Sequence, residues 1–416
     1  MKLGLIGEKL SHSYSKRIFE EILGYPFYDL VEVKRQDLAR FVATTDLDAF
    51  NVTVPYKTEI LPFLQGVDEK AKRIGAVNAV CRQADGFYGT NTDYDGLCIL
   101  LLRSGIPIAG KKVLILGTGG TSKTAEAVCR DLGAAEIVKV SRQKKDGAVC
   151  YAEAPFIGGE VIINTTPVGM FPNTQESPLD LSRFSGLCGV VDVIYNPLRT
   201  ALLQQAADLG IPAVSGLLML AGQAAAAEGF FFPKKGISSP MIFVNAAIIE
   251  DNLRRKTENL VLIGMPFAGK TTVGKLLAQA RNCPFYDTDN ELEAKIGSIP
   301  DYIRKNGEEA FRRAESELIA TLAATVRGAV IATGGGAVLR EENRRALREN
   351  ARVILLERDA DAIVFDASRP LSDSKEKWNA LWKVRAPIYR AFADIVAAGA
   401  QTPEEVCDQI VEELKQ

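Results

Sequence analysis

Residues 264–271 read Gly-Met-Pro-Phe-Ala-Gly-Lys-Thr and match the phosphate-binding pattern G-x-x-x-x-G-K-[ST] at every fixed position. The apolar run Leu260–Ile263 precedes this stretch and helix-forming residues follow it, so the sequence predicts a strand, a loop and a helix. In such a loop, backbone N–H groups bind phosphates, the lysine contacts the transferred group and the threonine hydroxyl binds Mg²⁺. About 250 residues precede the loop, and they must fold as something else.

Composition and charge are those of ordinary globular proteins. The chain has 416 residues, which predicts two or three domains. Hydrophobic residues make up 47% and charged residues 25%, and the formal net charge is −2 with no long basic block. These values argue against nucleic acid or an anionic membrane as the main partner, and no feature indicates an obligatory protein partner.

Several features favour a cytoplasmic protein. The N-terminal apolar run, Leu3–Ile6, is too short for a signal-peptide core. The apolar stretch Leu217–Phe232 contains Gln223 and Glu228, so we expect a buried helix rather than a membrane span. The seven cysteines are scattered and lack C-x-x-C, which favours reduced thiols. The single histidine, His12, argues against a histidine-ligated metal site or a histidine-driven catalytic triad.

Alternating apolar strands and helical stretches predict three α/β units. Residues 1–105, joined by helices within 216–250, form the first unit, and residues 106–215 form the second. The third unit covers residues 259–416. The boundary before it falls either at 233–240 or at 251–258, and we favour the charged segment 251–258 as the linker.

The second unit opens with a glycine-rich turn. A continuous apolar strand over 111–116 runs into Gly117-Thr-Gly-Gly120, and a helical stretch follows, as in a dinucleotide-binding βαβ unit. Ser122 stands at the third glycine position of G-x-G-x-x-G. A pyrophosphate would lie at the helix N-terminus. The next strand ends in the basic turn 141–145, which favours NADP over NAD, with a solvated basic turn as the alternative.

Four polar clusters fall in predicted loops of the first unit, at residues 11–15, 51–57, 75–78 and 91–93. Their hydroxyls, amides, amine and carboxylate suit a polyhydroxylated substrate. If Pro55 begins a helix, Lys57 lies in its first turn, where the helix dipole disfavours a cation by roughly 0.3–1 kcal/mol. That environment favours the neutral amine and proton exchange near neutral pH. An ordinary surface lysine is the alternative.

Residues 1–250 resemble shikimate dehydrogenases. The family's S-x-S, N-V-T-x-P-x-K, G-A-V-N and N-T-D motifs and its glycine loop match, in order, residues 13–15, 51–57, 75–78, 91–93 and 117–120. Further similarity covers 163–170, 192–197 and 219–223. Two departures are Lys16, where proline is usual, and Ser141–Gln143, where N-R-T is usual.

This resemblance implies a catalytic dyad of Lys57 and Asp93. The residues implied to hold the substrate's carboxylate and hydroxyls are Ser13, Ser15, Thr53, Asn78, Asp93 and Gln223. The residues implied to bind NADP are Gly117, Gly119, Gly120, Ser141, Arg142, Lys144 and Met219.

Residues 259–416 resemble shikimate kinases, which implies a P-loop domain with a parallel sheet, similar to nucleoside monophosphate kinases. Beyond the phosphate loop, the family's D-T-D, F-R-x-x-E, triple-glycine, R-P-L lid and R-x-P-x-Y motifs match residues 287–289, 311–315, 334–336, 369–371 and 385–389. One departure is the segment 359–368 before the lid, which is shorter than usual. It carries Phe365 and Asp366 where relatives have basic residues.

The kinase resemblance assigns roles to the motif residues. Lys270 and Asp289 are implied to be catalytic, and Thr271 and Asp287 to bind Mg²⁺. The residues implied to bind ATP are Gly264, Gly269, Lys270, Thr271, Thr272 and Arg369. The residues implied to bind shikimate are Asp289, Arg312, Gly334, Gly335, Gly336 and Arg385.

Together the two resemblances predict a bifunctional shikimate-pathway enzyme of the α/β class. An α/β substrate domain and a Rossmann-type NADP domain would reduce 3-dehydroshikimate with NADPH, and the kinase domain would phosphorylate the 3-hydroxyl of shikimate with ATP and Mg²⁺. The alternative is an NAD-dependent quinate/shikimate dehydrogenase fused to a non-catalytic, ligand-sensing kinase-like module. The intact acidic and lysine residues at both sites argue against that alternative.

Overall fold

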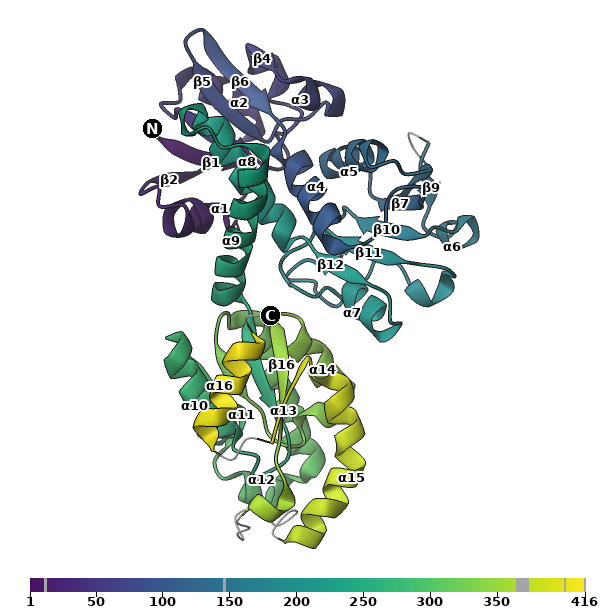
Figure 1. The fold of residues 1–416 in the computed structure, drawn as a ribbon, viewed down its shortest axis with the longest axis vertical. Helices are drawn as coiled ribbons and strands as arrows, with labels where there is room; N and C mark the ends of the chain where they lie inside the picture. Colours follow the sequence, from purple (N-terminus) through teal and green to yellow (C-terminus); the bar gives the residue numbers. More distant parts are fainter. Residues whose placement is uncertain (11–12, 145–146, 364–373, 400–401, 415–416) are drawn as a thin grey trace. The chain divides into compact units, whose positions relative to one another are not determined.

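The computed structural model describes residues 1–10, 13–144, 147–363, 374–399 and 402–414. The chain divides into two compact units (Figure 1). From here on, the first unit is Met1–Leu253, which includes the first two predicted units, and the second unit is Arg254–Gln416. Within the described ranges, no helix has both the length and the apolar character needed to cross a bilayer.

The first sheet has the strand order β2-β1-β3-β5-β6-β4. Its strands are β1 (Leu3–Gly7), β2 (Tyr28–Glu32), β3 (Ala49–Val52), β4 (Gly66–Val67), β5 (Ala79–Gln83) and β6 (Gly86–Thr90). β1 pairs in parallel with β2 and β3, whereas β5 runs antiparallel to both β3 and β6. The carboxyl ends of β1, β3 and β6 and the amino end of β5 therefore meet at one edge.

Several helices accompany this sheet in the chain. They are α1 (Ser15–Arg17), the π-helix η1 (Ile18–Ile22), α2 (Leu38–Thr44), α3 (Glu69–Ile74), α4 (Thr92–Ser104), α8 (Leu217–Phe231) and α9 (Ser239–Thr257). The last of them, α9, continues past the end of the first unit. α4 and α8 are in backbone contact, because a Cβ on Gly96 would lie 2.3 Å from the carbonyl oxygen of Met219. Nearly all of α8 is buried, which confirms the prediction of a buried helix.

Pro55 does not begin a helix, so the condition for placing Lys57 in a first helical turn is not met. Residues 54–60 form hydrogen-bonded turns. Tertiary packing determines this course, because the side chains of Tyr56 and Ile60 are fully buried. The carbonyl of Lys57 accepts a hydrogen bond from the N–H of Val77 at 2.7 Å rather than from a helical neighbour. The helix-dipole argument for Lys57 therefore does not apply.

The second sheet is parallel throughout, with the order β12-β11-β10-β7-β8-β9. Its strands are β7 (Lys112–Leu116), β8 (Glu136–Ser141), β9 (Val149–Cys150), β10 (Val161–Asn164), β11 (Gly189–Asp192) and β12 (Ala213–Ser215). Its helices are α5 (Gly120–Asp131), α6 (Ala154–Ile157) and α7 (Ala201–Asp208). The order reverses beside β7, the position at which doubly wound folds bind nucleotides.

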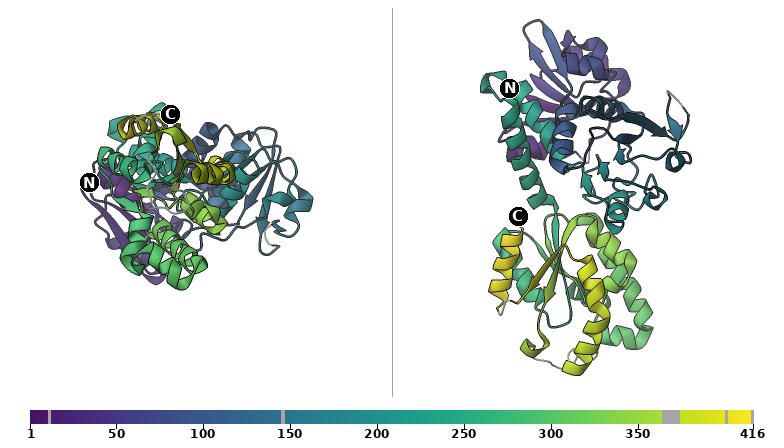
Figure 2. Two further views of the ribbon diagram at one scale, coloured as in Figure 1. Left: turned by 90° about the horizontal axis from the view of Figure 1, so that it is seen from below. Right: turned by 45° about the vertical axis from the view of Figure 1, so that its right-hand side comes forward.

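The second unit contains a five-stranded parallel sheet in the order β14-β15-β13-β16-β17. Figure 2 shows this unit in green to yellow in two further views. The strands are β13 (Asn259–Ile263), β14 (Phe285–Asp287), β15 (Val330–Ala332), β16 (Ala351–Glu357) and β17 (Ile395–Ala398). The helices are α10 (Lys270–Arg281), α11 (Thr288–Ile296), α12 (Ile299–Asn306), α13 (Glu308–Thr325), α14 (Glu341–Arg348), α15 (Lys375–Phe392) and α16 (Pro403–Glu413). The three sheets confirm the α/β class.

Short 3-10 turns connect several of these elements. They are η2 (Arg35–Asp37), η3 (Leu61–Phe63), η4 (Leu181–Arg183), η5 (Pro233–Lys235), η6 (Ala337–Leu339) and η7 (Ala360–Ala362). Residues 251–257, predicted as part of the linker, are the last turns of α9, and β13 begins at Asn259. Thr257 and Glu258 are buried, so this end of the segment packs as part of the fold.

Candidate active sites

The four polar clusters of the first unit come together at one edge of the first sheet. Residues 13–15 follow β1, residues 53–57 follow β3, and Asn91 to Asp93 follow β6. Asn78 precedes the antiparallel strand β5, and its carbonyl accepts a hydrogen bond from the N–H of Val52 at 2.8 Å. Strand direction therefore accounts for the convergence of motifs that are far apart in the sequence.

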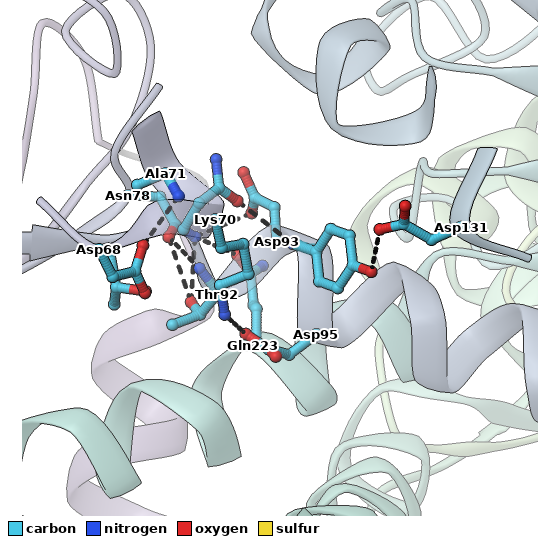
Figure 3. Close-up of polar contacts among 12 residues, drawn as sticks. Asp68, Lys70, Ala71, Asn78, Thr92, Asp93, Asp95, Asp131 and Gln223 are labelled. Atoms are coloured by element: carbon cyan, nitrogen blue, oxygen red, sulfur yellow. Dashed lines mark hydrogen bonds and ion pairs between the residues drawn. The ribbon is translucent and has the colours of Figure 1, made fainter. Parts of the chain in front are cut away.

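A hydrogen-bonded cluster joins Lys57, Asp93, Asn78, Thr92 and Gln223. Figure 3 shows Asn78, Thr92, Asp93 and Gln223 of this cluster side by side. Lys57 Nζ donates to Asp93 Oδ2 at 2.6 Å, and Asn78 Nδ2 donates to Asp93 Oδ1 at 2.9 Å. Asn78 also contacts Gln223 Oε1 at 3.2 Å. The side chains of Lys57 and Asp93 are only 17% and 4% exposed. This buried ion pair can hold an amine proton beside a substrate oxygen.

The start of α4 fixes the position of Asp93. The Asn91 side chain caps the helix by accepting from the N–H of Tyr94 at 3.2 Å, and its amide donates to the carbonyl of Ala76 at 3.0 Å. Asp93 therefore lies in the first helical turn, where the helix dipole favours a carboxylate. The N–H of Thr92 donates to Asn78 Oδ1 at 2.6 Å and attaches this turn to β5.

A second network lies beside Asp93, and Figure 3 labels Lys70, Asp95 and Asp131 among its members. Lys70 of α3 forms an ion pair with Asp95. The Tyr94 hydroxyl donates to Asp131 at 2.6 Å, and Asp131 also forms an ion pair with Arg73. Burial raises the pKa of the Asp95 carboxyl, and the charge of Lys70 opposes that shift. These contacts connect α3, α4 and the end of α5.

The glycine turn after β7 is open to a ligand. A Cβ on Gly119 or Gly120 would meet no atom within 4 Å, and no side chain caps α5 at Gly119. Gly117 has a φ of +108°, which favours glycine. Ser122 Oγ donates to the carbonyl of Gly117 at 2.8 Å and so closes the turn. The uncapped helix start fits a pyrophosphate group.

In its described residues, the basic turn after β8 presents one exposed arginine and one paired lysine, and Lys145 lies outside the described part of the chain. Ser141 ends β8, and Arg142 is exposed beside it. Lys144 Nζ lies 2.6 Å from Glu153 Oε1, so this amine already has a carboxylate partner. Met219 is buried in the core at 6% exposure.

The phosphate loop of the second unit follows β13 and leads into α10. Gly264 and Gly269 have φ values of +143° and +86°, which glycine tolerates and other residues rarely adopt. Lys270 Nζ donates to the carbonyls of Gly264 and Met265 at 3.0 and 2.9 Å. Lys270 and its neighbours line a cavity of about 330 Å³, together with Thr271, Thr272, Asp287 and Asp289.

Hard oxygen ligands gather on one side of this cavity. Thr271 Oγ1 donates to Asp287 Oδ2 at 2.6 Å. Asp287 also caps α11 by accepting from the N–H of Asp289 at 3.1 Å. A hydroxyl beside a carboxylate fits Mg²⁺, which prefers oxygen ligands.

The triple glycine admits charged side chains close to the backbone. A Cβ on Gly334 would lie 2.6 Å from Asp289 Oδ1, and one on Gly336 would lie 2.5 Å from the Arg312 guanidinium. Arg385 donates to the carbonyl of Gly335 at 3.3 Å, and the Tyr389 hydroxyl donates to the same oxygen. The guanidinium groups of Arg312 and Arg385 therefore both lie beside the triple glycine, where they could bind a carboxylate.

Comparisons with known proteins decide the family. A shikimate dehydrogenase of Clostridium beijerinckii is 34% identical over 241 residues, which cover 54% of this chain and 89% of the relative. The shikimate dehydrogenase substrate binding domain model matches residues 5–80. The chain belongs to the shikimate dehydrogenase family. The shikimate kinase family model matches residues 266–415, so the C-terminal unit is a shikimate kinase domain and the chain is a bifunctional shikimate-pathway enzyme.

Solved structures support the same assignment for the dehydrogenase unit. Shikimate dehydrogenase 1 from Peptoclostridium difficile is 35% identical, has a TM-score of 0.55, and matches 61% of this chain and 98% of its own. Shikimate 5-dehydrogenase from Thermus thermophilus, in complex with NADP(H) and shikimate, is 27% identical with a TM-score of 0.52 and covers 60% of this chain and 99% of its own.

The structure brings together some predicted dehydrogenase residues and leaves others apart. Ser13, Ser15 and Thr53 lie at the same sheet edge, but no hydrogen bond among the described residues connects them to Lys57 or Asp93. Ser13 Oγ instead accepts from the N–H of Ser15 at 3.2 Å. His12 lies outside the described residues.

Sequence reasoning missed several residues of the two sites. Thr92 was inside the N-T-D motif, so the signal was present but its bond to Asn78 was not foreseen. Glu315 lay in F-R-x-x-E, and it pairs with Arg312 at 2.8 Å; burial raises the pKa of its carboxyl, opposed by Arg312. Three predicted or quoted kinase residues, Arg369, Phe365 and Asp366, lie outside the described residues.

Proposed function

We propose that the dehydrogenase unit reduces the ketone of 3-dehydroshikimate to the hydroxyl of shikimate with NADPH. The observation that carries this proposal is the buried Lys57–Asp93 pair inside a ring of amide and hydroxyl groups. Bound NADPH would supply the hydride. The chain must then provide one proton to the oxygen that becomes the alkoxide.

The geometry favours Lys57 as the proton donor and Asp93 as its anchor. Both carboxylate oxygens of Asp93 accept hydrogen bonds, one from Lys57 and one from Asn78. An ammonium group has three N–H bonds, so Lys57 keeps hydrogens for the substrate oxygen while it contacts Asp93. We assign the substrate's carboxylate and hydroxyls to Ser13, Ser15, Thr53, Asn78 and Gln223, which flank the dyad or lie at the same sheet edge.

NADP is the cofactor that this site suits best. The open turn at Gly117–Gly120 would hold the pyrophosphate, and Arg142 would contact the 2′-phosphate. Ser141 and Met219 would complete the site. Lys144 would also contact the phosphate, after leaving Glu153. The Thermus thermophilus relative, crystallised with NADP(H) and shikimate, supports this choice.

We propose that the kinase unit transfers the γ-phosphoryl group of ATP to the 3-hydroxyl of shikimate. Thr271 and Asp287 would hold Mg²⁺, which would neutralise phosphate charge when bound. Lys270 would exchange its carbonyl partners for phosphate oxygens. Asp289, beside Gly334, would orient the shikimate hydroxyl and accept its proton, while Arg312 and Arg385 hold the carboxylate.

We further propose the domain bounds and setting that the sequence suggests. The substrate domain covers 1–105 and 216–250, the NADP domain 106–215, the linker 251–258 and the kinase domain 259–416. Seven scattered cysteines, all free, suit a reducing cytoplasm. Small-molecule substrates suffice for both reactions, and no protein partner is required.

One experiment tests both reactions. The full chain receives 3-dehydroshikimate, NADPH, ATP and Mg²⁺, and mass spectrometry identifies the products. We expect shikimate 3-phosphate in the complete mixture, shikimate without ATP, and no reduced product without NADPH. Unphosphorylated shikimate as the end product of the complete mixture would favour the alternative, in which the kinase-like module only senses ligands. Faster turnover with quinate and NAD would favour the other half of that alternative.

A further inference from the structure

Phe267 has a backbone conformation that residues with side chains rarely adopt. Its φ is +66°, and Asn282 is the only other non-glycine residue with positive φ in the described part of the chain. Phe267 belongs to the phosphate loop and lines the same cavity as Lys270 and Thr271. Such conformations persist only where the surroundings hold them, and they concentrate at ligand sites. The kinase unit must therefore contain contacts that hold this loop.

A buried tryptophan of α15 provides one such contact. Trp378 is 3% exposed, and its Nε1 donates to the carbonyl of Pro266 at 3.0 Å. That carbonyl belongs to the trans peptide between Pro266 and Phe267. The φ angle of Phe267 is the rotation about its N–Cα bond, and it sets the orientation of this peptide plane relative to the rest of Phe267. Fixing the carbonyl on Trp378 therefore restrains φ of Phe267 and turns the N–H of the same peptide away from α15.

Pro266 is also in contact on its other side. A Cβ on Gly335 would lie 3.0 Å from Cδ of Pro266, so the proline ring packs against the triple glycine. The two preceding carbonyls, of Gly264 and Met265, accept from Lys270. The loop is thus held at successive residues, and Trp378 of α15 provides a hydrogen bond to it from 112 residues away in the sequence.

We propose that Trp378 is a positioning residue of the phosphate loop, whose indole N–H keeps the 266–267 peptide in the orientation that receives the phosphates of ATP. This inference rests on the proposed kinase function and deepens it. Trp378 does not line the cavity, so it acts through the loop and not on a substrate. The effect of losing its N–H should therefore fall on the nucleotide and spare shikimate.

Trp378→Phe tests this role, because it keeps an aromatic ring and removes the donor. We expect KM for ATP to rise roughly 5- to 30-fold, the range for a buried carbonyl that loses its partner. KM for shikimate should change less than about twofold, because Trp378 donates to the phosphate loop and not to the groups proposed to hold shikimate. The reductase activity of the same chain measures how much intact protein each preparation contains.

Trp382→Phe is the matched control. Trp382 lies one helical turn further along α15, and its ring stacks on that of Trp378 with centroids 5.8 Å apart. None of the hydrogen bonds of the described residues uses its indole. We expect this control to keep KM for ATP within about twofold of the unmodified chain. A Trp378→Phe chain that behaves like the control would overturn the inference.

Phe267→Gly separates positioning from a general loss of packing. Glycine adopts positive φ without strain, so a loop with glycine at 267 needs less external restraint. In the Trp378→Phe background, we expect this change to lower KM for ATP by at least about threefold. A double variant as weak as Trp378→Phe, or weaker, would mean that Trp378 supports the fold alone, and it would contradict the proposal.

ADP binding gives a readout that does not depend on turnover. The sequence has two tryptophans, so Trp382→Phe leaves Trp378 as the one indole fluorophore. We expect ADP to change its emission, and equilibrium dialysis to show weaker ADP binding by Trp378→Phe by the same factor as KM. If the unmodified chain bound ADP but phosphorylated no shikimate, the proposed function would fail while the dialysis still decided the role of Trp378.

Discussion

The two sites hold the lysines that we propose to be catalytic in different ways. Lys57 of the dehydrogenase unit donates to a carboxylate, Asp93, at 2.6 Å. Lys270 of the kinase unit donates to two backbone carbonyls, those of Gly264 and Met265, at 3.0 and 2.9 Å. A carboxylate can stay in place throughout a reaction, whereas the two carbonyls compete with phosphate oxygens for the three N–H bonds of Lys270.

The dehydrogenase site is therefore arranged before substrate binds, whereas the geometry of the kinase site depends on the conformation of its phosphate loop. The dehydrogenase cluster consists of side chains bonded to one another, with Asn78 in contact with Asp93, Thr92 and Gln223. The kinase site combines side chains such as Asp287 and Arg385 with the backbone of the phosphate loop and the triple glycine. Substitutions should therefore act locally in the dehydrogenase site and through loop geometry in the kinase site.

The largest expected effect is that of Lys270→Ala. Removing the cation that contacts the transferred phosphoryl group should lower phosphorylation by about 10³-fold or more, the scale of a lost charge in phosphoryl transfer. Reductase activity should remain, because each unit has its own sheet and core. Parallel assays of both reactions on one preparation measure the two effects.

Lys275→Ala is the control for that substitution. Lys275 lies on the same helix, α10, but is exposed, so its loss should leave both activities within about twofold. If Lys270→Ala reduced both activities in a folded chain, the two units would not act independently.

The next effect is that of Lys57→Ala. Loss of a general acid should lower kcat for reduction by about 10²-fold or more, while the dissociation constant of NADPH changes little. Stopped-flow hydride transfer and NADPH fluorescence titration provide these measurements. Lys70→Ala removes another lysine that pairs with an α4 carboxylate, Asp95, and should lower kcat less than about fivefold. Equal losses from both lysines would refute the special role of Lys57.

A smaller effect is expected at the basic turn. Arg142→Ala should weaken NADPH binding by about 1–3 kcal/mol, the range of a charge-assisted hydrogen bond, and leave NADH almost unchanged. Arg130→Ala removes an exposed arginine of α5 that pairs with Glu126 and should affect neither cofactor. Calorimetric titration of each variant with both cofactors tests this, and a loss shared by NADH would make Arg142 structural.

Motifs and strand order made much of the fold and of both sites predictable. Apolar runs located β1, β7 and β13 to within one or two residues, because buried parallel strands are continuously apolar. Parallel strands also end at one edge, so residues near strand ends could be expected to converge there.

Tertiary contacts account for what the sequence did not reveal. The turns at 54–60 depend on the burial of Tyr56 and on the bond between Val77 and Lys57, both set by distant segments. Glu153 pairs with Lys144 across nine residues, and nothing in the basic turn itself predicts that partner. Trp378 contacts Pro266 across 112 residues, so no local pattern identifies it.

The smallest expected effect contrasts two buried carboxylates of the dehydrogenase unit. Asp93 has a lysine partner, whereas the described partners of Asp192 are neutral, namely Asn164, Thr200 and the N–H of Ile194. Burial raises the pKa of Asp192 to about 6, although these hydrogen bonds act to lower it. Because the folded-state pKa lies above the unfolded value, its stabilising contribution is complete at low pH and is lost as the pH rises through about 6.

Asp192→Asn isolates this term from the other carboxylates. The amide cannot ionise. The unfolding free energy of the unmodified chain minus that of the variant should therefore rise by about 1–2 kcal/mol as the pH is lowered from about 7.5 to about 5. Hydrogen-exchange protection of β11 in the full chain measures this difference where the side chain lies. If this difference in unfolding free energy stayed constant or became smaller as the pH was lowered, the neutral donors would hold the carboxylate ionised as effectively as water does. The contrast with the lysine-paired Asp93 would then lose its electrostatic basis.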